Sequence, residues 1–232
     1  MNKNKPVVVG HRGAMGYETE NTLASIQKAL DLGVDMIEID VFRIRSGEIV
    51  VFHDEKVNRL TNGAGFIEEF YAPQVNSLIL DGGHQIPYLQ DVLKLIDGKC
   101  KLNIELKGAN TARYVNSIIQ YYIEKRNWKT EDFLISSFNW DELESFYELN
   151  KEIAIGVLIE EKNPLEAITT AKKLNAMSIH PDFQKLTQEN IAQIKKEGFQ
   201  VYTWTVNEAT DIDRMKAFGV DGIITNYPDR VN

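Results

Sequence analysis

The stretch from Lys101 to Lys125, KLNIELKGANTARYVNSIIQYYIEK, contains the unit from which the rest of the chain is built. Residues 102–106 form a short apolar run typical of a buried strand. Apolar side chains then recur with the spacing of a helix that buries one face, at Val115, Ile118, Ile119, Tyr122 and Ile123. A strand followed at once by such a helix predicts a βα unit of a parallel sheet.

The same alternation of strand and helix continues on both sides of this unit. The other parallel strands that we expect are residues 7–10, 36–41, 133–137, 153–159, 177–180, 200–206 and 222–225. Helical patterns separate them, beginning near Thr22, Leu89, Asn139, Pro164, Thr187 and Asn207. Eight parallel strands with intervening helices predict an α/β fold, the TIM (β/α)8 barrel.

One additional apolar run, residues 49–53, does not fit the parallel pattern. Only seven residues separate Val41 from Ile49, whereas a parallel crossover needs about a dozen. We therefore expect an extra β-hairpin strand, followed by a small inserted subdomain at residues 54–87, which is rich in Gly, Asn and Asp. A chain of 232 residues with 43% apolar content is expected to form a single TIM-barrel domain over residues 1–232.

Composition narrows the classes of function. The formal net charge is −8, with no long cluster of basic residues, so we expect no nucleic-acid partner. Cys100 is the only cysteine, which excludes an intramolecular disulfide and a thiolate metal site. The sequence contains no apolar stretch long enough for a membrane span, and we expect a cytoplasmic protein.

Three acidic residues fall on predicted barrel strands. Because side chains alternate along a strand, Glu38 and Asp40 share one face and Glu105 shares the equivalent face of the strand at 102–106. Ionised carboxylates that face the barrel axis repel one another unless a cation lies between them. The oxygen donors suit one divalent cation, Mg²⁺ or Ca²⁺. The alternative is that these carboxylates only pair with nearby basic residues, such as Arg12 and Lys107.

Two histidines are expected at the mouth of the barrel. His11 ends the first strand, and His53 ends the hairpin strand. A pair of imidazoles beside a carboxylate cluster predicts general acid-base catalysis, because imidazole titrates near neutral pH. Cleavage of a phosphodiester needs both roles, since the nucleophile loses a proton and the leaving oxygen gains one.

Further residues are candidates for binding or support. Arg12 and Lys107 are expected to bind an anion that the acidic centre would otherwise repel. Glu20 and Asn21 precede the first helix and either cap it or orient Arg12 or a metal ligand. Trp204 is expected on the seventh parallel strand, where it forms either core or a wall of the substrate pocket.

The order of motifs resembles that of the glycerophosphodiester phosphodiesterase family. The resemblance runs nearly end to end and rests on His11-Arg12-Gly13, Glu20-Asn21-Thr22, Glu38-Ile39-Asp40-Val41, Val50-Val51-Phe52-His53-Asp54, Asn58-Arg59-Leu60-Thr61-Asn62-Gly63, Ile86-Pro87-Tyr88-Leu89, Asn103-Ile104-Glu105-Leu106-Lys107, Ser136-Ser137-Phe138, Trp204-Thr205-Val206-Asn207 and residues 219–228. One departure is Thr19, where the family usually has proline.

The resemblance implies a site and an activity. It implies that Glu38, Asp40 and Glu105 are metal ligands, that His11 and His53 are the acid-base pair, and that Arg12 and Lys107 contact phosphate. It also implies that the inserted subdomain partly covers this site. The implied reaction is metal-dependent hydrolysis of a small-molecule glycerophosphodiester, such as glycerophosphocholine or glycerophosphoethanolamine, to glycerol 3-phosphate and an alcohol. Two alternatives are lysophospholipase-D-like cleavage of lysophospholipids and a non-catalytic barrel that binds phosphodiesters.

Overall fold

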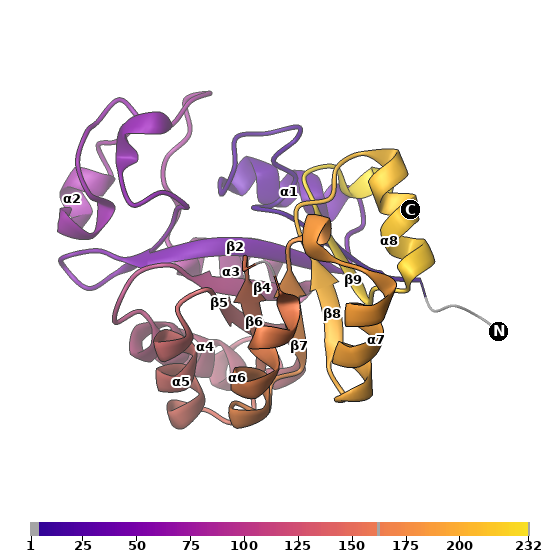
Figure 1. The fold of residues 1–232 in the computed structure, drawn as a ribbon. Helices are drawn as coiled ribbons and strands as arrows, with labels where there is room; N and C mark the ends of the chain where they lie inside the picture. The colour runs from indigo at the N-terminus through magenta and orange to yellow at the C-terminus, as the bar shows by residue number, and fades with distance from the viewer. Residues whose placement is uncertain (1–4, 162, 232) are drawn as a thin grey trace.

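The computed structural model describes residues 5–161 and 163–231. Within them, eight parallel strands close into a barrel, because β1 pairs with both β2 and β9. Figure 1 shows this barrel with helices around it. The strands are β1 (Val7–Gly10), β2 (Met36–Arg43), β4 (Lys101–Leu106), β5 (Phe133–Ser137), β6 (Ala154–Ile159), β7 (Ser178–Pro181), β8 (Gln200–Thr203) and β9 (Gly222–Thr225). The predicted TIM barrel is confirmed.

The helices begin close to the positions that the sequence predicts. Thr22 caps the first helix by accepting a hydrogen bond from the backbone N–H of Ser25, and Asn139 caps α5 in a similar way. The helices are α1 (Leu23–Asp31), α2 (Ala72–Val75), α3 (Leu89–Ile96), α4 (Ala112–Lys125), α5 (Trp140–Leu149), α6 (Ala167–Lys173), α7 (Gln188–Lys196) and α8 (Ala209–Phe218). Within the described residues, every helix is too short or too polar to cross a bilayer.

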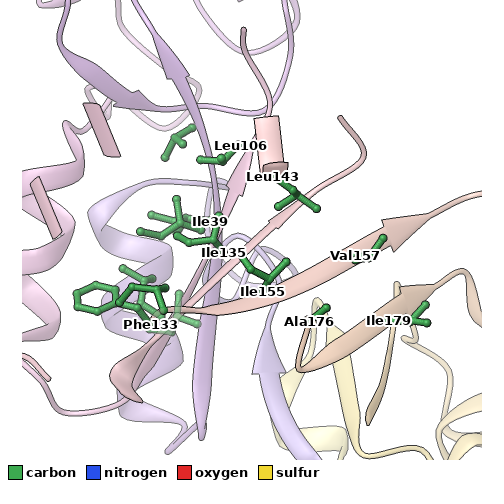
Figure 2. Close-up of a cluster of buried hydrophobic side chains, with 14 of the residues drawn as sticks. Ile39, Leu106, Phe133, Ile135, Leu143, Ile155, Val157, Ala176 and Ile179 are labelled. Carbon is green, nitrogen blue, oxygen red and sulfur yellow. The ribbon is translucent and has the colours of Figure 1, made fainter. Parts of the chain in front are cut away.

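The main core lies between the barrel and its helices. Ile39, Ile104, Ile135 and Ile155 occupy paired positions on the neighbouring strands β2, β4, β5 and β6, and all four are buried. Figure 2 shows three of them within this apolar layer. Burial of each such side chain stabilises the fold by about 1.5–3 kcal/mol. Side chains alternate along a strand, and these isoleucines point outward to the helices. The residues before and after each of them in the strand therefore point toward the barrel axis.

The extra strand is confirmed as β3 (Ile49–Val51), which pairs antiparallel with β2. It is shorter than the predicted run of residues 49–53. The following segment contains only short helical turns, η1 (Val57–Arg59), η2 (Ile67–Glu69) and α2. A second apolar cluster ties this insertion to β2 and β3, and its buried members are Phe42, Ile44, Val50, Phe52, Val57, Ile67, Val75, Leu78, Leu80 and Ile86. A single domain over residues 1–232 stays a prediction.

The end of β8 differs from the sequence prediction. The strand ends at Thr203 rather than at residue 206. The Trp204 N–H donates to the Pro181 carbonyl, whereas the Val206 N–H donates to the Ile224 carbonyl on the opposite neighbour. The chain therefore leaves the regular ladder at Trp204, which lies just beyond the strand and not on it.

Candidate active site at the carboxyl end of the barrel

A cleft with a volume of about 120 Å³ opens at the carboxyl end of the strands. This is the face where TIM barrels carry their active sites. The cleft brings together both histidines, two of the three acidic residues and both candidate anion-binding residues. Its lining is His11, Arg12, Glu38, His53, Asn103, Glu105, Lys107, Ser136, Phe138, Leu158, Trp204, Thr205 and Ile224.

The three predicted acidic residues form one cluster. Asp40 pairs with Glu105 across β2 and β4, and Glu38 lies two residues earlier on the same face of β2. One carboxylate oxygen from each lies within 4.8 Å of the others, and all three side chains are buried. Burial, with the charges of Asp40 and Glu105, raises the pKa of Glu38 well above its usual value. Burial and the charge of Asp40 raise the pKa of Glu105 to about 7.

The hydrogen bonds around this cluster leave oxygens for a cation. The buried Glu38 Oε1 has no hydrogen-bond partner among the described residues, which is costly for an ionised oxygen. The opposite oxygens are used by protein donors: Glu38 Oε2 by the Arg12 backbone N–H, Asp40 Oδ2 by Asn21 Nδ2, and Glu105 Oε1 by Lys107 Nζ. Three buried carboxylates, each with one oxygen not used in this way, fit a hard divalent cation.

The two histidines have different partners. His11 Nδ1 lies 2.7 Å from Asn226 Oδ1. Burial, followed by the charge of Arg12, lowers the pKa of His11 to about 4. His53 Nδ1 lies 2.7 Å from Asp54 Oδ1, and His53 Nε2 lies 3.3 Å from Lys107 Nζ. Both rings therefore have a polar group at Nδ1, and both line the cleft.

Arg12 is held from three directions. Its backbone N–H donates to Glu38 at 2.9 Å, its Nη1 donates to Glu20 at 2.6 Å, and its Nε forms an ion pair with Asp40 at 3.3 Å.

The backbone of Arg12 has a left-handed φ of 50°, and Gly13 follows with a φ of 82°. A side chain at Gly13 would meet the Ser25 backbone at 2.5 Å, so glycine is needed there.

Glu20 and Asn21 contact Arg12 and Asp40 and do not supply the cap of α1. Thr22 caps α1, while Glu20 contacts the Arg12 guanidinium and Asn21 donates to Asp40 at 2.8 Å. Glu20, Asn21 and Asp40 are buried and lie outside the cleft lining.

The aromatic wall of the cleft contains one predicted residue and one that was missed. Trp204 lies in the cleft wall with its indole N–H donating to the His180 carbonyl. It packs edge to face against Phe138, whose ring centroid is 5.4 Å away. His180 itself is fully buried, with Nε2 2.8 Å from Ser178 Oγ.

Sequence reasoning also missed four polar residues near the site. Asn226 contacts His11, Asn103 and Ser136 line the cleft floor, and Asp54 contacts His53. Asn103 lies two residues before Glu105 on β4 and so shares its strand face. The position of Asp54 beside His53 was the one local signal that could have indicated an orienting partner.

Comparison with known proteins gives a consistent result. Residues 11–230 match the model of the glycerophosphoryl diester phosphodiesterase family. The chain is 34% identical to a glycerophosphodiester phosphodiesterase of Caldanaerobacter subterraneus subsp. tengcongensis, covering 97% of this chain and 96% of that protein. It is 32% identical to one from Bacillus altitudinis, covering 96% of this chain and 95% of that protein.

A solved structure agrees with these relatives. A phosphodiesterase of Oleispira antarctica, in complex with its product sn-glycerol 3-phosphate, is 28% identical with a TM-score of 0.88, covering 97% of this chain and 95% of that one. The fold and these relatives define an enzyme of the phosphoric diester hydrolase class. The chain belongs to the glycerophosphoryl diester phosphodiesterase family, as the resemblance implied. The roles of the individual site residues stay predictions.

The raised carboxyl pKa values predict how stability depends on pH without a divalent cation. Between the ordinary Glu pKa of 4.5 and about 7, the folded Glu105 keeps a proton that the unfolded chain has released. The contribution of Glu105 to stability should therefore fall as pH rises through this window, whereas the contribution of His11, whose pKa is lowered to about 4, should rise. Urea midpoints in the presence of a chelator, measured from pH 4.5 to 7.5, should have a more negative slope against pH in wild type than in Glu105→Gln, because His11 is present in both proteins. Equal slopes for the two proteins would contradict the raised pKa.

Proposed function

We propose that the protein hydrolyses glycerophosphodiesters, such as glycerophosphocholine or glycerophosphoethanolamine, to glycerol 3-phosphate and an alcohol. The observation that carries this proposal is the single cleft in which His11 and His53 lie beside Glu38 and Glu105. Family membership and the glycerol 3-phosphate complex of the Oleispira relative support the substrate class.

Glu38, Asp40 and Glu105 would hold one divalent cation, Mg²⁺ or Ca²⁺, through the oxygens that face one another. When bound, such an ion acts as a Lewis acid toward a phosphoryl oxygen. Arg12 and Lys107 would bind the non-bridging oxygens and stabilise the negative charge that builds on them during the reaction. Arg12 Nη2 donates no hydrogen bond to the described residues, so it can reach a ligand while Glu20 holds Nη1 and Asp40 holds Nε.

The hydrogen bonds of the two rings favour one division of the acid and base roles. His11 Nδ1 would donate a hydrogen bond to the side-chain oxygen Oδ1 of Asn226, which leaves Nε2 of the neutral ring with a lone pair. With its lowered pKa, His11 is neutral at pH 7 and would accept the proton of the nucleophile, which is water or the glycerol 2-hydroxyl. Asp54 can stabilise the positive charge of a protonated His53, which would donate from Nε2 to the leaving alkoxide.

An assay of glycerol 3-phosphate release from glycerophosphocholine tests the proposed activity. We expect release that a chelator abolishes and that Mg²⁺ or Ca²⁺ restores, because the acidic cluster needs a cation to hold its ionised form. Glu38→Gln should lower the activity at every cation concentration, whereas the exposed Glu124→Gln on α4 should match wild type. Cleavage of lysophosphatidylcholine alone, or binding without release, would overturn the proposal in favour of the alternatives.

Replacement of the histidines tests the acid and base roles. His11→Ala and His53→Ala should each lower kcat for glycerophosphocholine by at least about 100-fold. With a p-nitrophenyl phosphodiester, whose leaving group departs without a proton, the loss in His53→Ala should shrink by at least about tenfold, but not in His11→Ala. Near-normal turnover by both variants would contradict the catalytic pair, and a leaving-group effect confined to His11→Ala would reverse the roles.

A further inference from the structure

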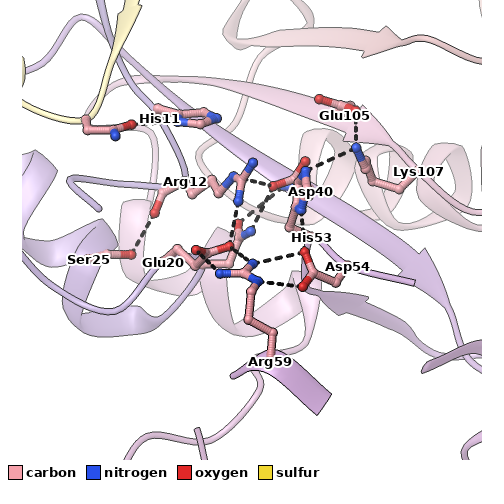
Figure 3. A network of polar contacts seen from close by, with 12 residues as sticks. His11, Arg12, Glu20, Ser25, Asp40, His53, Asp54, Arg59, Glu105 and Lys107 are labelled. Carbon is pink, nitrogen blue, oxygen red and sulfur yellow. Dashed lines mark hydrogen bonds and ion pairs between the residues drawn. The ribbon is translucent and has the colours of Figure 1, made fainter. Parts of the chain in front are cut away.

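The guanidinium of Arg59 joins two carboxylates that each hold a candidate catalytic residue. Its Nε and Nη2 donate to the two oxygens of Asp54 at 2.6 and 2.9 Å. Its Nη1 and Nη2 donate to the two oxygens of Glu20 at 2.9 and 2.8 Å. Figure 3 shows Arg59 reaching from below toward both acids. Four of its five N–H groups are thus used, so a substrate phosphate would have to compete with two bidentate ion pairs.

The contact with Asp54 determines which nitrogen of His53 carries a proton. Arg59 donates to both oxygens of Asp54, which fixes the carboxylate in one orientation beside His53, and the same hydrogen bonds lower the pKa of Asp54 to about 2, so that it accepts hydrogen bonds without donating any. His53 Nδ1, 2.7 Å from Asp54 Oδ1, must therefore be the protonated nitrogen. Nε2 then faces Lys107 and the cleft as the nitrogen that exchanges a proton.

The contact with Glu20 acts on Arg12. Glu20 Oε1 accepts from Arg12 Nη1 at 2.6 Å and from Arg59 Nη2 at 2.8 Å. Burial would raise the pKa of Glu20, but the hydrogen bonds from Arg59 and the charge of Arg12 lower it instead. Glu20 therefore stays ionised and keeps the Arg12 guanidinium in one orientation.

Arg59 belongs to the inserted segment and not to the barrel. It ends η1, whose Val57 is buried in the second apolar cluster. The insertion also contacts the loop between β1 and α1, which contains Glu20. There the Thr19 hydroxyl donates to the Asp81 carbonyl at 2.9 Å. An exposed single ion pair contributes little, and the Arg59 side chain is 47% exposed, but the bidentate geometry on both acids fixes its position.

We propose that Arg59 is a positioning residue, which sets the tautomer and orientation of His53 through Asp54 and the orientation of Arg12 through Glu20. The consequence for catalysis rests on the proposed function. The inserted segment, which contributes no residue to the cleft lining, then acts on catalysis through Arg59.

Two replacements test the route through Asp54. Arg59→Gln removes the guanidinium that binds both Asp54 and Glu20. Asp54→Asn supplies an amide that can donate to His53 Nδ1, and so permits the tautomer with the proton on Nε2. Arg59→Lys keeps the charge but loses the bidentate geometry and should recover part of the activity. Arg214→Gln on α8 is the matched control, because Arg214 has a similar exposure of 45% and pairs with Asp211 outside the cleft.

The decisive readout is the ¹⁵N NMR spectrum of the His53 ring in the intact protein, together with kcat and KM for glycerophosphocholine. At a pH at which the ring is neutral, wild type and Arg214→Gln should show the tautomer with the proton on Nδ1, whereas Asp54→Asn and Arg59→Gln should show a population of the tautomer with the proton on Nε2. We expect kcat to fall about tenfold or more in Arg59→Gln and about 100-fold in Asp54→Asn, with the melting temperature near that of wild type.

The outcomes separate this proposal from the proposed function. The ring spectrum needs no substrate, so a wild-type protein that fails to cleave glycerophosphocholine would overturn the function while the spectrum still tests Arg59. An unchanged tautomer in both variants, or a kcat in Arg59→Gln equal to that of Arg214→Gln, would overturn the positioning role.

Discussion

Mutual repulsion among three buried carboxylates is the constraint on which the site depends. The register of β2 and β4 places Asp40 beside Glu105, and the alternation along β2 adds Glu38. The apolar layer on the other side of the same strands holds this arrangement. Because side chains alternate along a strand, the acidic residues could leave the barrel axis only if their apolar neighbours turned into it. The raised pKa values of Glu38 and Glu105 express the cost of this arrangement, and a divalent cation would remove that cost.

The positive charges around the cluster contact the cluster itself, and Arg12 also contacts one acid outside it, Glu20. Arg12 contacts Asp40 and Glu20, and Lys107 contacts Glu105 at 3.0 Å. Glu20 in turn meets Arg59 from the insertion. Charges of alternating sign thus run from the barrel interior to the surface. This arrangement keeps Arg12 and Lys107 beside the cleft, each in an ion pair with one member of the acidic cluster.

Local periodicity was enough to predict the barrel and much of the site. The alternation of Glu38 and Asp40 with Ile39 gives the inward face, because a strand repeats every two residues. The position of His11 directly after β1 places it at the mouth, because the carboxyl ends of the parallel strands meet at one face of the barrel. Contacts that join distant segments were beyond this reasoning: Asn226 meets His11 across 215 residues, and the pairing of Arg59 with Glu20 needs the folded insertion. The end of β8 at Thr203 likewise depends on the two neighbouring strands.

A crystal structure of the protein grown with saturating Ca²⁺ tests the central claim most directly. The account predicts one ion among Glu38, Asp40 and Glu105, with an oxygen of each at about 2.3–2.6 Å. Arg12 and Lys107 should then remain beside the ion and face the open cleft. Carboxylates that bind no ion at saturating Ca²⁺ and stay paired with Arg12 and Lys107 would contradict the account.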